Sequence, residues 1–247
     1  MPETLMPEAI KKTHKKKEAI QLEFLNLTSH QLRTPLSGSK WLLELLQKSD
    51  TGNLNKKQKD FIEKLQIENE RMIALVNDLL EVTRIEAGQS KLYLQPADLA
   101  PVIRGLIKEK ERQIKQKKLQ IVFTTEQEPL PQVRTEINKI KQVLLNLISN
   151  AISYTPEGGK ITIDLQIQED IMLGTISDTG IGIPKDQQKD IFTKFFRGSN
   201  VASMETTGTG LGLYICKAFI EASGGKLWFK STEGKGTSFY FSLPIVK

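Results

Sequence analysis

The chain reads LNLTSHQLRTPLSGSKWLLELL from residue 25 to residue 46. Five leucines in this stretch recur at spacings of 7, 4, 7 and 3 residues, and they are Leu25, Leu32, Leu36, Leu43 and Leu46. In an α-helix these spacings keep the five side chains on one stripe. The stretch therefore predicts a long amphipathic helix with one apolar face.

A second helix of the same kind is expected downstream. Its apolar residues recur at spacings of 4, 7, 3, 4 and 3, and they are Phe61, Leu65, Met72, Leu75, Leu79 and Val82. Residues 49–53 have turn composition, Asn55 and Gln58 have the spacing of a capping box, and Gly88 suits the C-terminal cap. Two such helices with a short connection form an antiparallel hairpin.

A lone hairpin cannot bury both apolar stripes. A second copy of the chain would cover them and give a dimeric four-helix bundle. The hairpin follows from the periodicity, whereas the homodimer is inferred from the stripes that the hairpin leaves uncovered.

Beyond the hairpin the hydrophobic period changes. Short β-like runs occupy Lys91–Leu94, Leu119–Thr124, Lys160–Gln168, Ile171–Ser177, Lys226–Lys230 and Thr237–Leu243. Helical patterns occupy Leu99–Gln116, Glu136–Ser153 and Leu211–Ala222, and Pro184–Gly208 is expected to be a long functional loop. The pattern predicts two domains, a helical one at residues 1–89 and a sheet covered by helices at residues 90–247.

Composition narrows the class of protein. The net charge of +6 allows a nucleic-acid partner, but residues 11–17 and 108–118 carry much of it on helix-like segments, which favours solvated helix faces and no nucleic acid. The single cysteine, Cys216, excludes an internal disulfide and a cysteine-cluster metal site. No run of about eighteen apolar residues and no signal peptide occur, so we expect a cytoplasmic chain, or the cytosolic portion of a membrane-bound sensor with further sequence upstream.

His30 is one of two histidines and is expected to face water. At about 100° per residue, the leucine stripe lies roughly 200–240° from it. Arg33 and Thr34 share its face one turn on, and Pro35 then interrupts the helix. A neutral imidazole is a ready nucleophile near neutral pH, although an exposed histidine taken alone is more often incidental.

Three strings in the second domain suit a nucleotide. Asn146 and Asn150 lie at i and i+4, so their amides project from one helix face, toward phosphates and a metal. Asp178 follows a strand within D-T-G-I-G and can accept a hydrogen bond from an adenine amine, and G-T-G-L-G at residues 208–212 opens a helix, whose N–H groups suit phosphates. A Rossmann turn is excluded because no acidic ribose reader follows at the expected offset.

The string S-H-Q-L-R-T-P-L at residues 29–36, preceded by Phe24, resembles the phosphoacceptor box of sensor histidine kinases. In their order and spacing, the three later strings resemble the N, G1 and G2 boxes of the GHKL (Bergerat) ATPase fold. Phe192, Phe195 and Phe196 resemble the F box, and residues 234–237 resemble the closing glycine motif. The resemblance covers residues 20 to 245. It implies a helical dimerisation and phosphotransfer hairpin, followed by an α/β sandwich that binds ATP and Mg²⁺.

The resemblance also implies roles for individual residues. His30, Gln31 and Thr34 are expected at the phosphotransfer site, with Thr34 positioning water for dephosphorylation of the regulator. Asn150 is expected to ligate Mg²⁺. The expected ATP-binding residues are Asn146, Asn150, Tyr154, Asp178, Gly180, Gly182, Lys185, Phe192, Arg197, Gly208, Thr209, Gly210, Leu211 and Gly212.

Two positions depart from the family pattern. Gln31 stands where relatives carry an acidic residue, and an amide can orient the imidazole but cannot take up its proton. Ser153 stands where many relatives place a cation toward the phosphates, and Lys185 or Arg197 is expected to compensate. Autophosphorylation slower than with glutamate is therefore expected.

The resemblance implies autophosphorylation of His30, relay to an aspartate of a response-regulator receiver domain, and regulator phosphatase activity. Because of Gln31, a kinase-like phosphatase or scaffold that binds nucleotide but transfers poorly remains the alternative. A chaperone or topoisomerase fragment of the same fold is disfavoured by the acceptor hairpin, and a pure coiled-coil adaptor by the nucleotide strings. The sequence leaves open whether His30 is phosphorylated in the same chain or across the dimer.

Overall fold

The computed structural model describes residue 32 and residues 34–47, 54–90, 92–199 and 208–246. The chain forms two compact units. A helical unit contains residues 1–91 together with 207–209, and a sandwich unit contains residues 92–206 and 210–247. The predicted phosphotransfer residues His30 and Gln31 lie outside the described residues.

The helical unit contains two neighbouring antiparallel helices, one at residues 34–47 and α2 at Lys56–Glu86. Gln47 Nε2 donates to Gln66 Oε1 at 2.7 Å, and Lys40 pairs with Glu70 at 3.3 Å. Residues nearer the end of the first helix thus meet residues nearer the start of α2. The hairpin connectivity is therefore as predicted.

Both ends of α2 form as expected. Asn55 Oδ1 accepts from the Gln58 N–H at 2.9 Å, and Gln58 Oε1 accepts from the Asn55 N–H at 2.8 Å, which completes the capping box. At the other end, Gly88 adopts φ +64°, and the N–H groups of Gly88 and Gln89 donate to the carbonyls of Ile85 and Arg84. These two bonds form a Schellman motif, whose left-handed residue is most easily a glycine.

The predicted apolar stripe of α2 is mostly exposed in the single chain. Phe61 and Leu65 are 54% and 57% exposed, and Met72 and Leu75 are also exposed. Of the predicted stripe only Val82 is fully buried, and the other buried positions of α2 lie beside the stripe: Ile62, Asn69, Leu80 and Thr83. The hairpin thus leaves a row of large apolar side chains facing outward.

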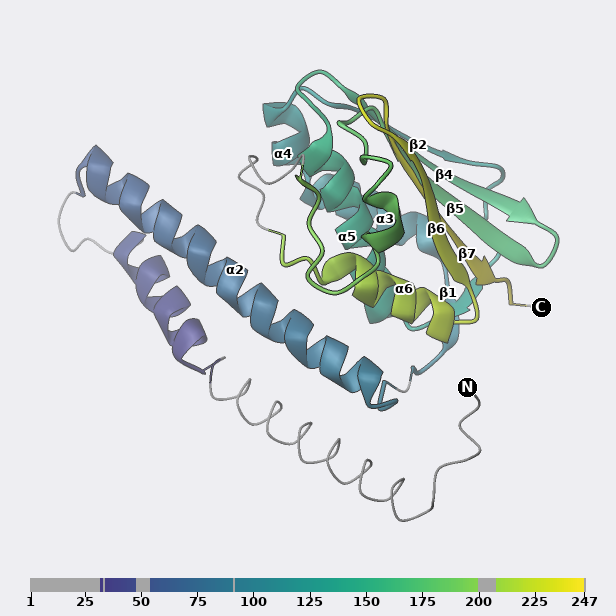
Figure 1. Ribbon diagram of the computed structural model, residues 1–247, viewed down its shortest axis with the longest axis horizontal. Coiled ribbons are helices and arrows are strands. Elements are labelled where there is room, and N and C mark those ends of the chain that lie inside the picture. Colours follow the sequence, from purple (N-terminus) through teal and green to yellow (C-terminus); the bar gives the residue numbers. More distant parts are fainter. Residues whose placement is uncertain (1–31, 33, 48–53, 91, 200–207, 247) are drawn as a thin grey trace, which may run out of the picture. The chain divides into compact units, whose positions relative to one another are not determined.

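The sandwich unit follows as an α/β domain. Its elements in chain order are β1 (Gln95–Ala97), α3 (Leu99–Glu109), α4 (Glu111–Gln116), β2 (Gln120–Thr125), β3 (Val133–Thr135), α5 (Ile137–Tyr154), β4 (Lys160–Gln168), β5 (Ile171–Asp178), the 3₁₀ helix η2 (Gln188–Asp190), α6 (Gly212–Ala222), β6 (Lys226–Thr232) and β7 (Gly236–Pro244). The main sheet has the strand order β2-β4-β5-β7-β6. Strands β2 and β4 are parallel, and the other pairs are antiparallel. Figure 1 shows the helices of this unit gathered on one face of the sheet.

The core lies between the sheet and its helices. Inward residues alternate along the central strands, for example Ile161, Ile163 and Leu165 of β4. From the other side α5 buries one apolar face: Ile140, Val143, Leu144, Leu147, Ile148, Ala151 and Ile152. Because this face is anchored along the whole helix, the polar residues at its edge are held in place as well.

Two predictions about this unit need correction, and one strand was missed. The first strand is β1 at Gln95–Ala97 and not the predicted run at 91–94, because it forms where β3 can pair with it, Gln95 opposite Thr135. Strand β3 was not predicted, since three residues carry too little pattern. The predicted helix at 99–116 is interrupted at Lys110, although the Lys110 and Ile114 N–H groups still donate to the carbonyls of Leu106 and Lys110.

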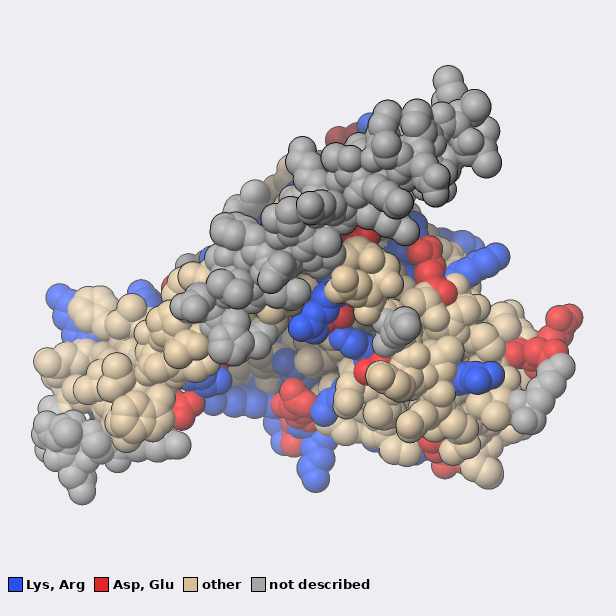
Figure 2. Space-filling view, turned by 90° about the horizontal axis from the view of Figure 1, so that it is seen from below, with Lys and Arg blue, Asp and Glu red and all other residues tan. Residues whose placement is uncertain are grey.

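Charged side chains of the sandwich unit lie mainly at its surface, several of them in ion pairs. Lys115 pairs with Glu111 at 2.6 Å, and Lys217 pairs with Glu221 at 3.9 Å. On the face drawn in Figure 2, basic and acidic side chains occur beside one another.

None of the helices in the described ranges combines the length and apolar character needed to cross a membrane.

Replacing Gly174 with alanine tests the packing of the core. A Cβ at Gly174 would lie 2.1 Å from the ring of Phe241, which is fully buried, so we expect a loss of roughly 1–3 kcal/mol in the free energy of unfolding. Urea denaturation, followed by Trp228 fluorescence in a Trp41→Phe background, measures it.

Gly105→Ala is the matched control, because Gly105 lies exposed within α3 with nothing within 4 Å of the added atom. That variant should gain up to about 1 kcal/mol from helix propensity. Equal effects of the two substitutions would contradict the packing described for Gly174.

Candidate functional site

The polar edge of α5 is the first part of the candidate site. Asn146, Asn150 and Tyr154 recur every fourth residue and are all half-buried. Asn150 Nδ2 donates to Asn146 Oδ1 at 3.2 Å. Among the described residues, no donor reaches the side-chain oxygen of Asn150, Oδ1. The pair therefore holds its amides in one orientation and leaves an oxygen ligand, of the kind that Mg²⁺ prefers, at the edge of the helix.

Asp178 ends β5 and forms the second part. Its Oδ1 accepts the N–H of Gly180 at 2.8 Å and that of Thr237 at 3.2 Å. Burial raises the pKa of Asp178 above its ordinary value, and these two backbone hydrogen bonds oppose the shift in part. One carboxylate oxygen is thus fixed by the backbone while the other stays available to a ligand.

The turn after Asp178 rests on the end of α5. The Ile181 N–H donates to the Tyr154 carbonyl at 3.2 Å. A Cβ at Gly180 would lie 2.6 Å from both the Tyr154 carbonyl oxygen and Asp178 Oδ1, so only glycine fits there. Asp178 and Tyr154, predicted from separate strings, are therefore brought together.

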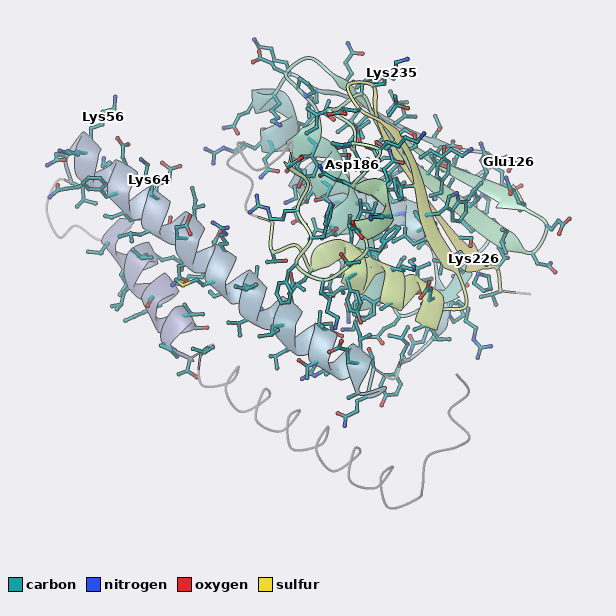
Figure 3. The ribbon with its side chains drawn as sticks, viewed as in Figure 1. Lys56, Lys64, Glu126, Asp186, Lys226 and Lys235 are labelled. Atoms are coloured by element: carbon teal, nitrogen blue, oxygen red, sulfur yellow. The ribbon has the colours of Figure 1, made fainter. Side chains whose placement is uncertain are left out.

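Gly182 meets the β6–β7 turn on the other side. It adopts φ +65°, and an added Cβ would lie 2.1 Å from the Thr232 carbonyl oxygen. The Gly234 N–H donates to the Ile181 carbonyl at 2.7 Å. At Gly180 and Gly182, the space that a side chain would take is thus occupied in part by backbone carbonyl oxygens of the chain itself. Figure 3 labels Lys235 in this turn.

The loop predicted from residue 184 carries the aromatic residues and the candidate cations. Lys185 and Arg197 are exposed, and Asp186, beside Lys185, is labelled in Figure 3. Phe192 packs edge-on against Phe229 with ring centroids 5.9 Å apart. The loop contains η2, which the sequence did not predict.

Two reciprocal cation–π contacts join this loop to α6. Lys217 of α6 lies 5.3 Å from the Phe192 ring centroid, and Lys194 of the loop lies 5.5 Å from that of Tyr214. Phe195 adopts φ +62°, and an added Cβ on Gly210 would lie 2.8 Å from the Phe195 backbone. The F-box segment therefore lies against the start of α6.

The glycine string at residues 208–212 divides between the units. Gly208 and Thr209 belong to the helical unit, and the sandwich unit contains Gly210, Leu211 and Gly212. Leu211 is fully buried, and a Cβ at Gly212 would lie 2.1 Å from Asn146 Nδ2. The N-terminus of α6 is therefore in contact with the amide row of α5, which consists of the side-chain amides of Asn146 and Asn150.

The sequence did not predict that Lys117 and the backbone N–H of Thr237 contact the residues of the candidate site. Lys117 was assigned to a solvated face, but it is half-buried and its Nζ donates to three carbonyls at the end of α5. Burial lowers the pKa of this amine. No local pattern marks either contact, because Lys117 is 35 or more residues from its partners and Thr237 is 59 residues from Asp178.

Two family models match the chain in succession. The His Kinase A (phospho-acceptor) domain matches residues 20–88. The histidine kinase-, DNA gyrase B-, and HSP90-like ATPase family matches residues 135–247. The second match contains all the site residues of α5, β5 and α6.

Individual relatives agree with these matches. The chain is 38% identical over 226 residues to the sensor histidine kinase WalK of Bacillus subtilis (strain 168), covering 90% of this chain and 36% of WalK. The structure of full-length ShkA in complex with AMPPNP matches with a TM-score of 0.75 at 28% identity, covering 91% of this chain and 46% of that one. The catalytic domain of the histidine kinase ThkA matches with a TM-score of 0.54 at 34% identity, covering 62% of this chain and 95% of that domain.

Asp178→Asn should remove one contribution to the pH dependence of stability. Because the pKa of Asp178 is raised above 3.8, the folded chain binds this proton more tightly than the unfolded chain. The free energy of unfolding of the unmodified chain, relative to that of Asp178→Asn, should be greatest below about pH 4. It should fall as the pH rises through the folded-state pKa and stay constant above it. Urea denaturation at a series of pH values measures this difference, and a difference that grows with pH would contradict the assignment.

Proposed function

This chain belongs to the sensor histidine kinases of two-component systems, and on that premise we propose that it phosphorylates its own His30 with ATP bound in the sandwich unit. The observation that carries the proposal is the joined edge of Asn146, Asn150, Tyr154 and Asp178. It combines an amide row, a half-buried carboxylate and a helix N-terminus in the region that matches the ATPase family. The relative ShkA, solved with AMPPNP, supports an adenine nucleotide as the ligand.

In this proposal Asp178 and Gly182 contact the adenine. Because Gly180 and Thr237 hold Oδ1, the other carboxylate oxygen can accept a hydrogen bond from the exocyclic amine. Tyr154 lies at the edge of the nucleotide, since its carbonyl is joined to the same turn.

The phosphates are proposed to lie along the amide row and the start of α6. Asn146 and the part of the glycine string that belongs to the sandwich unit, Gly210, Leu211 and Gly212, would donate hydrogen bonds to them. Lys185 and Arg197 would supply positive charge from the loop, which Phe192 anchors to the sheet. The Asn150 carbonyl fits a Mg²⁺ ligand, and the ion would neutralise charge on the phosphates when bound.

Transfer requires a neutral imidazole. A ring nitrogen of His30 would attack the γ-phosphorus, so that an N–P bond forms, the bond to the β,γ-bridging oxygen breaks and ADP leaves. Gln31 can orient the ring through its amide oxygen, and water would take the ring proton that Gln31 cannot accept. The phosphoryl group would then pass to an aspartate carboxylate of a response-regulator receiver domain.

A homodimer is proposed as the working form. In the described part of the helical unit, the large apolar side chains that remain exposed are Leu32, Trp41, Leu42, Leu45, Leu46, Phe61, Leu65, Ile67, Met72 and Leu75. A row of this length on one hairpin is best covered by a second copy, as in other four-helix bundles.

A second candidate activity follows from Gln31. A chain that binds ATP but transfers slowly would act mainly as a regulator phosphatase or a scaffold. Thr34, exposed in the first helix of the hairpin, would position the water for that dephosphorylation. Rates of labelling separate the two activities.

Labelling with γ-³²P-ATP and Mg²⁺ tests the kinase activity. We expect acid-labile, base-stable label that disappears in His30→Ala and forms several-fold faster in Gln31→Glu, because glutamate can accept the ring proton. His14→Ala, which removes the other histidine, is the matched control and should keep the label. Label that survives in His30→Ala would refute the acceptor, and no label despite ATP binding would favour the phosphatase or scaffold.

Selectivity for adenine tests the role of Asp178. Calorimetry should show tighter binding of ATP than of GTP, which carries a carbonyl where adenine has its amine. Asp178→Asn should weaken ATP binding roughly 10- to 100-fold, the equivalent of one hydrogen bond to a charged group. It should also reduce the preference for ATP over GTP. Asp164→Asn, on the sheet face opposite the helices, is the control. An unchanged preference in Asp178→Asn would reject this assignment.

A further inference from the structure

Lys117 binds the C-terminal end of α5 from a different element. It is the residue that follows α4, and its Nζ donates to the carbonyls of Ile152, Ser153 and Thr155 at 2.9, 2.7 and 3.1 Å. An ammonium group has three N–H donors, so these three bonds use all of them. Such complete use is unusual for a surface lysine, whose amine normally stays in water.

The acceptors are carbonyls that the helix itself cannot satisfy. The last carbonyls of an α-helix have no partner within it, and the end of the helix dipole there favours a positive charge. The last turn of α5 contains no basic residue of its own, and Pro156, just after the helix, has no N–H to donate. Lys117 therefore acts as a C-terminal cap that α5 lacks in its own sequence.

The remaining carbonyls at this end are also bound. The Ala151 carbonyl accepts from the Thr155 N–H at 3.1 Å and from its hydroxyl at 2.6 Å. The Tyr154 carbonyl accepts from Ile181, in the turn after Asp178. The same short stretch of backbone is thus shared between Lys117 and the turn that carries the carboxylate.

Backbone bonds hold Lys117 itself in place. Its carbonyl accepts from the Gly158 N–H at 2.9 Å, and the Gln120 N–H donates to the Gly159 carbonyl at 2.9 Å. The chain at residues 117–120 is therefore joined to the turn at 156–159 by two backbone hydrogen bonds, one of them to Lys117 itself.

We propose that Lys117 is a positioning residue for the nucleotide site: by capping α5 it fixes Tyr154, and through the Tyr154 carbonyl it fixes the Asp178 turn. This rests on the proposed function, since the site is taken to bind ATP. Lys117 itself touches no substrate. Without its ammonium, the end of α5 frays and the distance between the amide row and Asp178 is no longer set.

The test compares Lys117→Met with Lys118→Met, both in the full chain and at a temperature where circular dichroism shows each variant folded. Lys117→Met should weaken ATP binding about tenfold, the equivalent of about one hydrogen bond to a charged group, whereas Lys118→Met should stay within about twofold. Lys117→Arg should recover most of the affinity, because a guanidinium also donates to carbonyls. A purely structural lysine would lower the unfolding temperature and leave the affinity of the folded protein unchanged, which would overturn the proposal.

Hydrogen exchange provides a readout that needs no nucleotide. The amide of Ile181, bonded to the Tyr154 carbonyl, should exchange at least several-fold faster in Lys117→Met than in Lys118→Met. Equal exchange in the two variants would overturn the positioning role even if ATP binds. Faster exchange in a chain that binds no ATP would instead refute the proposed function and keep the positioning role.

Discussion

The end of α5 is the constraint on which the polar edge of the sandwich depends. The five consecutive backbone carbonyls from Ala151 to Thr155 all accept hydrogen bonds. Their donors are the hydroxyl and N–H of Thr155, the ammonium of Lys117 and the N–H of Ile181. Buried or half-buried carbonyls without partners are costly, so this end forms only when the flanking turns are in place. The turn after Asp178 is one of them, which couples the carboxylate to the helix.

The apolar face of α5 makes that edge rigid. Seven of its side chains are buried between the sheet and the neighbouring helices, and the polar row at Asn146, Asn150 and Tyr154 lies along the border of this packed surface. Close packing leaves little freedom to rotate the helix, so amides that would otherwise sample many directions share one. The helical unit follows a different logic, because its largest apolar side chains remain exposed in a single copy.

Local patterns predicted the elements whose stability is local. The capping box at Asn55 and the left-handed Gly88 depend on residues a few positions apart, and both formed as predicted. Long alternating strands such as β4 and β5 were likewise found where the period predicted them. Strand β1 was misplaced and β3 was missed, because three-residue strands exist only through their pairing with each other.

The sequence by itself determined the two-part architecture and the residue types of the candidate site, since periodicity and motif spacing depend on neighbours along the chain. Only the tertiary structure decided what those residues contact. It joined Asp178 to the backbone of Thr237, filled the space at Gly180 and Gly182 with the chain's own backbone, and brought Lys117 to the end of α5. The physical reason is that each of these contacts spans many residues, so its partner is selected by the packing of the sheet and helices and leaves no local signal in the sequence.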